Sequence, residues 1–254
     1  MLLCHQHKNR PGAMTEPRLF VANHLSAGAE TVLSAAQTHY LLHVLRLSEG
    51  AEILVFDGIN GEWRARIVAA KKTGCRILIA GLVRSQTAAQ DVHYAFAPLK
   101  QARLDYLVQK AVEMGASLLQ PVITAHTAVS RLNLERMRAN AIEAAEQCGI
   151  LAVPSIASPL KLEALLKTCE IGRTVVFCDE CAPAAPPLAA LARLKGCKIT
   201  ALIGPEGGFS KDERAMLLSK DFVCSISLGP RIMRADTAAV AALALINAVL
   251  GDWR

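Results

Sequence analysis

Two stretches rich in glycine and proline in the C-terminal half contain the residues best suited to hold a small ligand. They read Leu202-Ile-Gly-Pro-Glu-Gly-Gly-Phe-Ser210 and Leu228-Gly-Pro-Arg-Ile-Met-Arg234, and each follows an apolar run. Gly204, Gly207 and Gly208 allow tight turns and let a ligand approach bare backbone. Neither stretch has the spacing of a dinucleotide fingerprint or a Walker loop. A single glycine-rich loop often serves packing alone, but a pair favours one ligand held between the two loops.

The elements that position these loops are strands and helices in alternation from residue 91 onward. We expect strands at 92–97, 118–123, 153–156, 174–178, 198–203 and 222–228, and helices at 103–114, 134–147, 188–194, 214–218 and 237–250. Ser158 with Pro159 predicts a further helix start, and Ser210 with Glu213 forms a capping box. This alternation implies a parallel sheet covered on both faces, with ligands at the carboxyl ends of its strands.

The N-terminal part has a different pattern, in which short strands and turns surround one helix. Strands are expected at 52–57, 62–68 and 75–83, with a helix at 35–45, and this pattern suggests a small β-barrel. Arg64 and Arg66 alternate with apolar residues and should share one face of their strand. We predict three segments: a disordered extension at 1–16, within which Met14 is a possible natural start, the β-barrel domain at 17–87, and the α/β domain at 91–254.

Composition favours a globular protein with a polyanionic partner. The 254 residues are 52% hydrophobic and 20% charged, with a net charge of +6. Residues 1–90 carry ten Lys and Arg against six Asp and Glu, so the positive excess is densest there. No apolar run reaches the ~18–20 residues of a membrane span. The eight scattered cysteines include one CxxC, Cys178 to Cys181, without a second pair, so we expect a soluble, cytoplasmic protein with no metal.

Taken together, the motifs of the chain resemble those of the RsmE-type 16S rRNA (uracil-N3)-methyltransferases, a branch of the SPOUT superfamily. The pairing of IGPEGG at 203–208 with LGPRxxR at 228–234 carries most of the resemblance. Supporting motifs are Arg18-Leu-Phe20, His39-Tyr-Leu-Leu-His-Val-Leu-Arg46, Phe56-Asp-Gly58, Gln109-Lys110, Glu113-Met-Gly115, Pro121 and Glu146-Gln-Cys-Gly149. The resemblance covers nearly the whole chain from Arg18.

The resemblance implies an α/β fold class: a small PUA-like RNA-binding β-barrel, then a SPOUT parallel-sheet domain with a C-terminal trefoil knot. It also implies S-adenosylmethionine as cofactor and a homodimer. The substrate would be a uridine of 16S rRNA, naked or in the assembled small ribosomal subunit, methylated at N3. The residues implied in cofactor binding are Leu202, Ile203, Gly204, Pro205, Glu206, Gly207, Gly208, Leu228, Gly229, Ile232, Met233, Arg234 and Thr237. The segment 177–179 is a weaker candidate for a third loop.

Methylation at uridine N3 requires loss of the N3 proton, and the developing negative charge needs a cation nearby. Arg234 and Arg231 lie in the second loop and are therefore the candidate catalytic residues. Each could instead form a salt bridge with Glu206 or Asp236, and either of these carboxylates could be the base.

The candidate RNA-binding residues are Arg18, Arg46, Arg64, Arg66 and His126. The chain departs from the family pattern at Ile150, where an arginine is usual, and at Ala125-His-Thr127, where a Ser-Glu-Arg-like triplet is usual. It also has Met233-Arg-Ala-Asp-Thr-Ala238 in place of Leu-Arg-x-Glu-Thr-Ala. Two other functions stay open: a SPOUT methyltransferase with another acceptor such as tRNA, and an RNA-binding protein that has lost catalysis.

Overall fold

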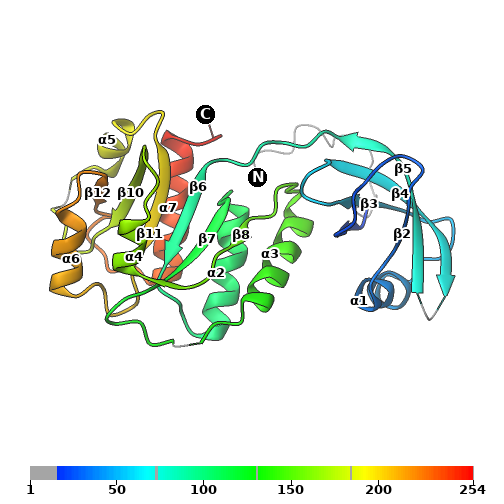
Figure 1. Ribbon diagram of the computed structural model, residues 1–254, viewed down its shortest axis with the longest axis horizontal. Helices are drawn as coiled ribbons and strands as arrows, with labels where there is room; N and C mark the ends of the chain where they lie inside the picture. Colours follow the sequence, from blue (N-terminus) through cyan, green and yellow to red (C-terminus); the bar gives the residue numbers. More distant parts are fainter. Residues whose placement is uncertain (1–15, 72–73, 130, 184, 254) are drawn as a thin grey trace. The chain divides into compact units, whose positions relative to one another are not determined.

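A computed structural model describes residues 16–71, 74–129, 131–183 and 185–253 of the chain (Figure 1). The chain divides into two compact units, Met1–Thr87 and Ala88–Arg254. The predicted disordered extension lies outside the described residues, except for Glu16. None of the helices in the described segments is long and apolar enough to cross a lipid bilayer.

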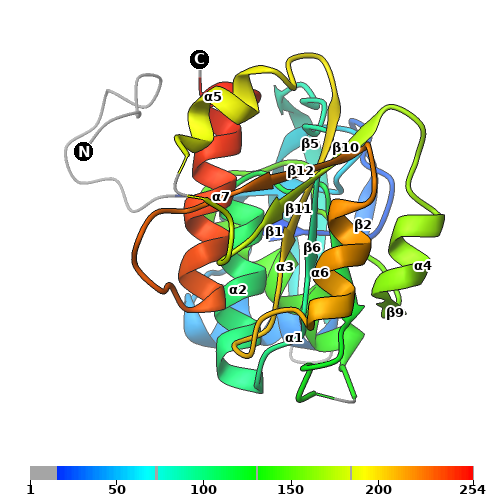
Figure 2. The same cartoon turned by 90° about the vertical axis from the view of Figure 1, so that its left-hand side faces the viewer.

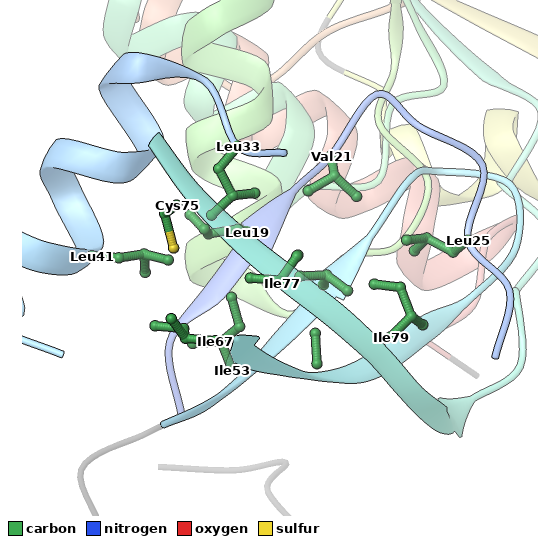
Figure 3. Close-up of a cluster of buried hydrophobic side chains, with 12 residues drawn as sticks. Leu19, Val21, Leu25, Leu33, Leu41, Ile53, Ile67, Cys75, Ile77 and Ile79 are labelled. Atoms are coloured by element: carbon green, nitrogen blue, oxygen red, sulfur yellow. The ribbon is translucent and has the colours of Figure 1, made fainter. Parts of the chain in front are cut away.

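The N-terminal unit is a five-stranded sheet in the order β1-β3-β4-β5-β2. Its strands are β1 (Arg18–Phe20), β2 (Glu30–Val32), β3 (Glu52–Phe56), β4 (Glu62–Lys71) and β5 (Gly74–Arg84). β1 pairs with β3 in parallel, and the other pairs are antiparallel. Alternate residues of β4 and β5 face a common apolar core, in which Ile67, Ile77 and Ile79 lie beside Leu19 and Leu41 (Figure 3).

The helical stretch predicted at 35–45 is helical, but it is not one α-helix. α1 (Ala35–His39) begins with a capping box between Ser34 and Gln37 and continues into a π-helix, η1 (Tyr40–Val44). The Leu45 N–H bonds to the Tyr40 carbonyl, five residues back. After this wide turn, Arg46 takes a left-handed backbone conformation with φ of 56°.

The C-terminal unit is built on a parallel sheet in the order β12-β10-β11-β6-β7-β8, which confirms the predicted fold class. The strands are β6 (Val92–Phe96), β7 (Leu118–Ile123), β8 (Ser155–Ile156), β9 (Leu160–Lys161), β10 (Arg173–Cys178), β11 (Lys198–Ile203) and β12 (Val223–Ile226). The helices are α2 (Gln101–Glu113), α3 (Leu134–Cys148), α4 (Leu162–Lys167), α5 (Pro187–Ala192), α6 (Lys211–Leu218) and α7 (Ala235–Val249). Figure 2 shows α2 and α7 on one face of the sheet and α4 and α6 on the other.

The predicted helix start at Ser158 and Pro159 is wrong. α4 begins at Leu162 with Lys161 as its N-cap, because Leu160 and Lys161 first pair with β7 as the short strand β9. The Ser158 carbonyl accepts a hydrogen bond from the Gln120 side chain at 2.8 Å. This contact with a distant strand outweighs the local capping signal.

Other local signals are confirmed. The Asn133 side chain caps α3, Gly149 ends it with φ of 70°, and Ser210 with Glu213 forms the predicted capping box of α6. The trefoil knot stays a prediction, because strand order and register do not determine how a chain is threaded.

Candidate functional site

A cavity of about 190 Å³ opens at the carboxyl ends of β10, β11 and β12. These strands are parallel neighbours in the sheet, so the loops that follow them meet at one edge. The lining residues come from the ends of β10 and β11, the three loops, α6 and the start of α7: Phe177–Cys181, Ile203–Glu206, Gly208, Phe209, Arg214, Ser227–Met233, Ala235 and Ala238. The two glycine-rich loops therefore do face one cavity, and the loop after β10 completes it.

The loop after β11 owes its shape to close contacts that need glycine. A Cβ at Gly204 would lie 2.7 Å from the Phe209 ring, which itself packs edge-on against Phe177 at 5.1 Å. Gly208 has φ of 66°, and its N–H bonds to the Pro205 carbonyl at 2.9 Å. A Cβ at Gly208 would overlap the Glu180 carboxylate. The turn therefore presents bare backbone to the cavity.

The loop after β12 is more open. Gly229 has φ of 107°, and its N–H reaches the Ser227 hydroxyl at 3.3 Å. Ile232, an apolar residue, is 98% exposed at the tip of this loop. Arg234 is the N-cap residue of α7, but its side chain makes no capping bond.

An ion pair between the buried Asp179 and the partly exposed Arg214 supports the third loop. Asp179 is 4% exposed, and the Arg214 Nε–H is shared between its two carboxylate oxygens, each at 3.1 Å. Arg214 Nη2 lies 2.9 Å away. The Cys181 N–H and the Ser225 hydroxyl donate to the same carboxylate at 3.0 and 3.3 Å. Asp179 thus ties α6 and β12 to the end of β10, and the guanidinium of Arg214 becomes part of the cavity wall.

The neighbouring thiols differ in environment. Burial raises the pKa of the Cys178 thiol to about 12, so it stays neutral at neutral pH, whereas Cys181 is exposed. Within the described residues, no three or more His, Cys, Asp or Glu side chains gather as a metal site would require.

Most of the predicted cofactor-binding residues lie on the cavity wall: Ile203, Gly204, Pro205, Glu206, Gly208, Leu228, Gly229, Ile232 and Met233. Leu202 is fully buried in the core, and Gly207, Arg234 and Thr237 are not among the lining residues. Sequence reasoning missed Glu180, Cys181, Phe209, Arg214, Ser227, Pro230, Ala235 and Ala238. The available signal was the acidic pair Asp179-Glu180 directly after a buried strand.

The candidate catalytic arginines are exposed. Arg231 lines the cavity, and Arg234 follows it at the start of α7. Neither forms an ion pair with any described residue. The carboxylates considered as their partners are engaged elsewhere: Glu206 pairs with Arg103 at 3.1 Å, and Asp236 accepts the Thr237 N–H at 2.8 Å. Both guanidinium groups are therefore available to a substrate.

Among the candidate RNA-binding residues, Arg18 is mostly engaged inside its own unit. Its Nε donates to buried Glu62 at 2.6 Å, and Arg84 binds the other oxygen of that carboxylate at 2.7 Å. Burial alone would raise the pKa of Glu62, but the hydrogen bonds from Arg84 and Arg18 outweigh it, so the net pKa is lowered.

Arg64 and Arg66 lie on one face of β4, as predicted, and both reach Glu52 on the adjacent strand at 3.2 Å. Arg46 is exposed. In the part of the chain that the structure describes, no carboxylate pairs with Arg46.

His126 belongs to the C-terminal unit, in the loop after β7. Its Nδ1 lies 2.9 Å from the Gly207 carbonyl oxygen, so it contacts the loop after β11 directly. The roles predicted for all these residues in catalysis, cofactor binding and RNA binding stay predictions.

Two family models match the chain. The model described as the RNA methyltransferase domain matches residues 86–247, and that of the RNA methyltransferase PUA domain matches residues 33–80. The ribosomal RNA small subunit methyltransferase E of Synechocystis is 32% identical over 249 residues, which cover 96% of this chain and 82% of that protein. The chain belongs to the ribosomal RNA small subunit methyltransferase E family. Its Rickettsia conorii relative of the same name is 29% identical over 91% of this chain and 94% of its own length.

Solved structures of similar proteins agree with this assignment. The enzyme of this name from Neisseria gonorrhoeae, bound to S-adenosyl methionine, superposes with a TM-score of 0.81 at 25% identity, covering 94% of this chain and 100% of that one. A methyltransferase from Legionella pneumophila in complex with the same cofactor gives a TM-score of 0.80 at 26% identity, covering 92% and 98%. The N-terminal unit is thus PUA-like, and the C-terminal unit is the methyltransferase domain.

Proposed function

We propose that this protein uses S-adenosylmethionine to methylate N3 of a uridine in 16S rRNA of the small ribosomal subunit. One observation carries the proposal: the loops after β10, β11 and β12 enclose one cavity in a chain of this family. We propose that residues 91–254 bind the cofactor and catalyse methyl transfer, while residues 17–87 bind RNA.

The residues of the cavity suit this cofactor. Gly204 and Gly208 present bare backbone to the cavity, and a Cβ at either position would collide with the Phe209 ring or the Glu180 carboxylate that also line it. S-Adenosylmethionine carries a sulfonium and an ammonium against one carboxylate, so it is a net cation, and the carboxylate of Glu180 on the wall complements that charge. The bound cofactor would supply an electrophilic methyl group.

The residues of this chain then have to position the uridine and stabilise charge. As N3 loses its proton, negative charge spreads over the ring oxygens, and a fixed cation near them lowers the barrier. Arg234 and Arg231 are suited to this role because both guanidinium groups are exposed beside the cavity and unpaired within the described chain. We assign the larger part to Arg234, because the first turn of α7 fixes its backbone.

The proposed partners are 16S rRNA, alone or in the small subunit, and a second copy of this chain. The homodimer is part of the proposal because the resemblance of the chain to the SPOUT methyltransferases implies it. Because the proposed substrate is made and assembled in the cytoplasm, we place the reaction there.

The test compares rRNA from cells with and without the gene. Nucleosides from digested 16S rRNA are separated and identified by mass spectrometry. 3-Methyluridine should be absent from the deletion strain. It should return when the wild-type gene is supplied, but not when the Arg234→Ala variant is supplied. Loss of a methylated nucleoside from tRNA instead would assign another acceptor. Calorimetry with S-adenosylmethionine and the purified protein tests the alternative of an RNA-binding protein that has lost catalysis, because a protein without the cofactor site would give no heat of binding.

A further inference from the structure

The loop after β7 is docked on the outside of the loop after β11. The Nδ1 atom of His126 lies 2.9 Å from the carbonyl oxygen of Gly207 and 3.2 Å from that of Gly208. Carbonyl oxygens only accept hydrogen bonds, so Nδ1 must carry the proton that is shared between them. A Cβ at Gly207 would lie 3.3 Å from the Cβ of His126, so the two loops are also in van der Waals contact.

Further hydrogen bonds hold the His126 loop in place. The Thr127 hydroxyl accepts from the Thr124 N–H at 2.8 Å and closes the turn. The Ala125 N–H donates to Glu213 Oε1 at 2.8 Å, while the other oxygen of Glu213 accepts from the Ser210 N–H at 2.9 Å. Glu213 therefore joins this turn to the start of α6. The backbone that carries His126 is thus held in place next to Gly207 and Gly208.

The two carbonyls belong to the part of the cofactor loop with the greatest conformational freedom. Two successive glycines lose more backbone entropy on ordering than any other pair of residues. Gly208 lines the cavity, while the His126 ring, which is not among the lining residues, contacts the carbonyl oxygen of Gly208. A hydrogen bond that orders the segment before binding reduces the entropy that binding would otherwise lose.

We propose that His126 is a positioning residue that holds the Gly207–Gly208 segment in its cofactor-binding conformation. It acts through the loop and does not touch the cofactor, and this role replaces the RNA contact expected from the sequence. The turn is one of the places where this chain departs from the family pattern, with Ala125-His-Thr127 in place of a Ser-Glu-Arg-like triplet. The inference rests on the proposed function, because it takes S-adenosylmethionine as the ligand of the cavity.

The test uses the full-length protein and three variants. His126→Ala removes the donor, and His126→Asn places an amide N–H close to the position of Nδ1. His43→Ala is the matched control, because His43 is also exposed and contacts another histidine ring, His39, in the N-terminal unit. The measurements are the Kd of S-adenosylhomocysteine by calorimetry, kcat and KM for RNA, and backbone hydrogen exchange of residues 204–210 without ligand.

We expect His126→Ala to weaken S-adenosylhomocysteine binding about three- to tenfold, the usual effect of losing one hydrogen bond. Exchange across residues 204–210 should accelerate in the free protein, and His126→Asn should restore both values to within about twofold. The KM for RNA and kcat at saturating cofactor should change little, and His43→Ala should leave Kd and exchange unchanged.

Two results would overturn the proposal. One is an unchanged Kd with unchanged exchange in His126→Ala, and the other is a raised KM for RNA with normal cofactor affinity, which would return His126 to RNA binding. If the wild-type protein fails to bind S-adenosylhomocysteine, the proposed function fails, while the exchange data still report whether His126 orders the loop.

Discussion

Gly208 offers a quantitative test of the cofactor site, because its backbone conformation and its surroundings both oppose a side chain. Its φ of 66° lies in the left-handed region, which costs an L residue about 1–2 kcal/mol. A Cβ would also overlap the carboxylate of Glu180, which is exposed and free to move toward the cavity. We therefore expect Gly208→Ala to fold but to distort the cavity wall.

The strain can lower either the stability of the protein or its affinity for the cofactor, and both quantities can be measured. If the loop keeps its conformation, the cost of about 1–2 kcal/mol appears as lower stability toward urea. If the loop relaxes, cofactor binding has to restore the strained form, and the affinity falls by about fivefold to thirtyfold. The displaced Glu180 carboxylate adds to the loss of affinity, so we expect at least a roughly fivefold higher Kd by calorimetry.

Gly172 provides a matched control at the other end of β10. Its φ is 81°, and a Cβ there would have no atom within 4 Å, so Gly172→Ala carries a similar backbone cost away from the cavity. That variant should lose stability and keep the wild-type Kd. The reasoning would be refuted if Gly208→Ala lost as much stability as Gly172→Ala and none of its cofactor affinity.

Three further predictions concern charged groups. The lowered pKa of Glu62 means that its ionised form stabilises the fold at neutral pH, and that this contribution is lost as the pH falls through the lowered pKa. Glu62→Gln should therefore lower the free energy of unfolding by about 1.5–3 kcal/mol near neutral pH and by far less in acid, below the lowered pKa, as measured by tryptophan fluorescence in urea. Asp179→Asn should lower stability by about 1–3 kcal/mol and raise the cofactor Kd, since it weakens the support of the third loop. Arg234→Ala should slow single-turnover methylation by about 100-fold with little change in Kd, and Arg234→Lys should rescue part of the rate if charge matters more than geometry.

The sequence was most informative where a structure depends on nearby residues. Apolar periodicity placed the main strands and helices, and local caps such as Asn133, Gly149 and the Ser210–Glu213 pair are confirmed. Prediction from the sequence failed where a residue far away in the chain determines the local structure. The short strands β2 and β9 exist because β5 and β7 offer them pairing edges, and pairing of β9 displaced the helix start predicted at Ser158.

The site divides in the same way. Glycine content identified two of the three loops, because a bare backbone is a property of the residues themselves. The third loop depends on Asp179 and Arg214, which are 35 positions apart in the chain and meet only when α6 folds over the end of β10. Periodicity carries no information about such a pair. An acidic residue directly after a buried strand was the available hint.

The same distinction bears on the RNA-binding face that we propose for the N-terminal unit. The sequence shows which residues are arginines, but the register of the sheet shows which of them are already neutralised. Glu52 lies opposite Arg66 in the β3–β4 ladder and pairs with both Arg66 and Arg64. A guanidinium held by a carboxylate has to give up that pair before it binds a phosphate, which lowers its net contribution to RNA affinity by up to about 1 kcal/mol for an exposed pair. Arg46 has no such pair among the described residues and is exposed, so it is the arginine of this set with most to gain from a phosphate.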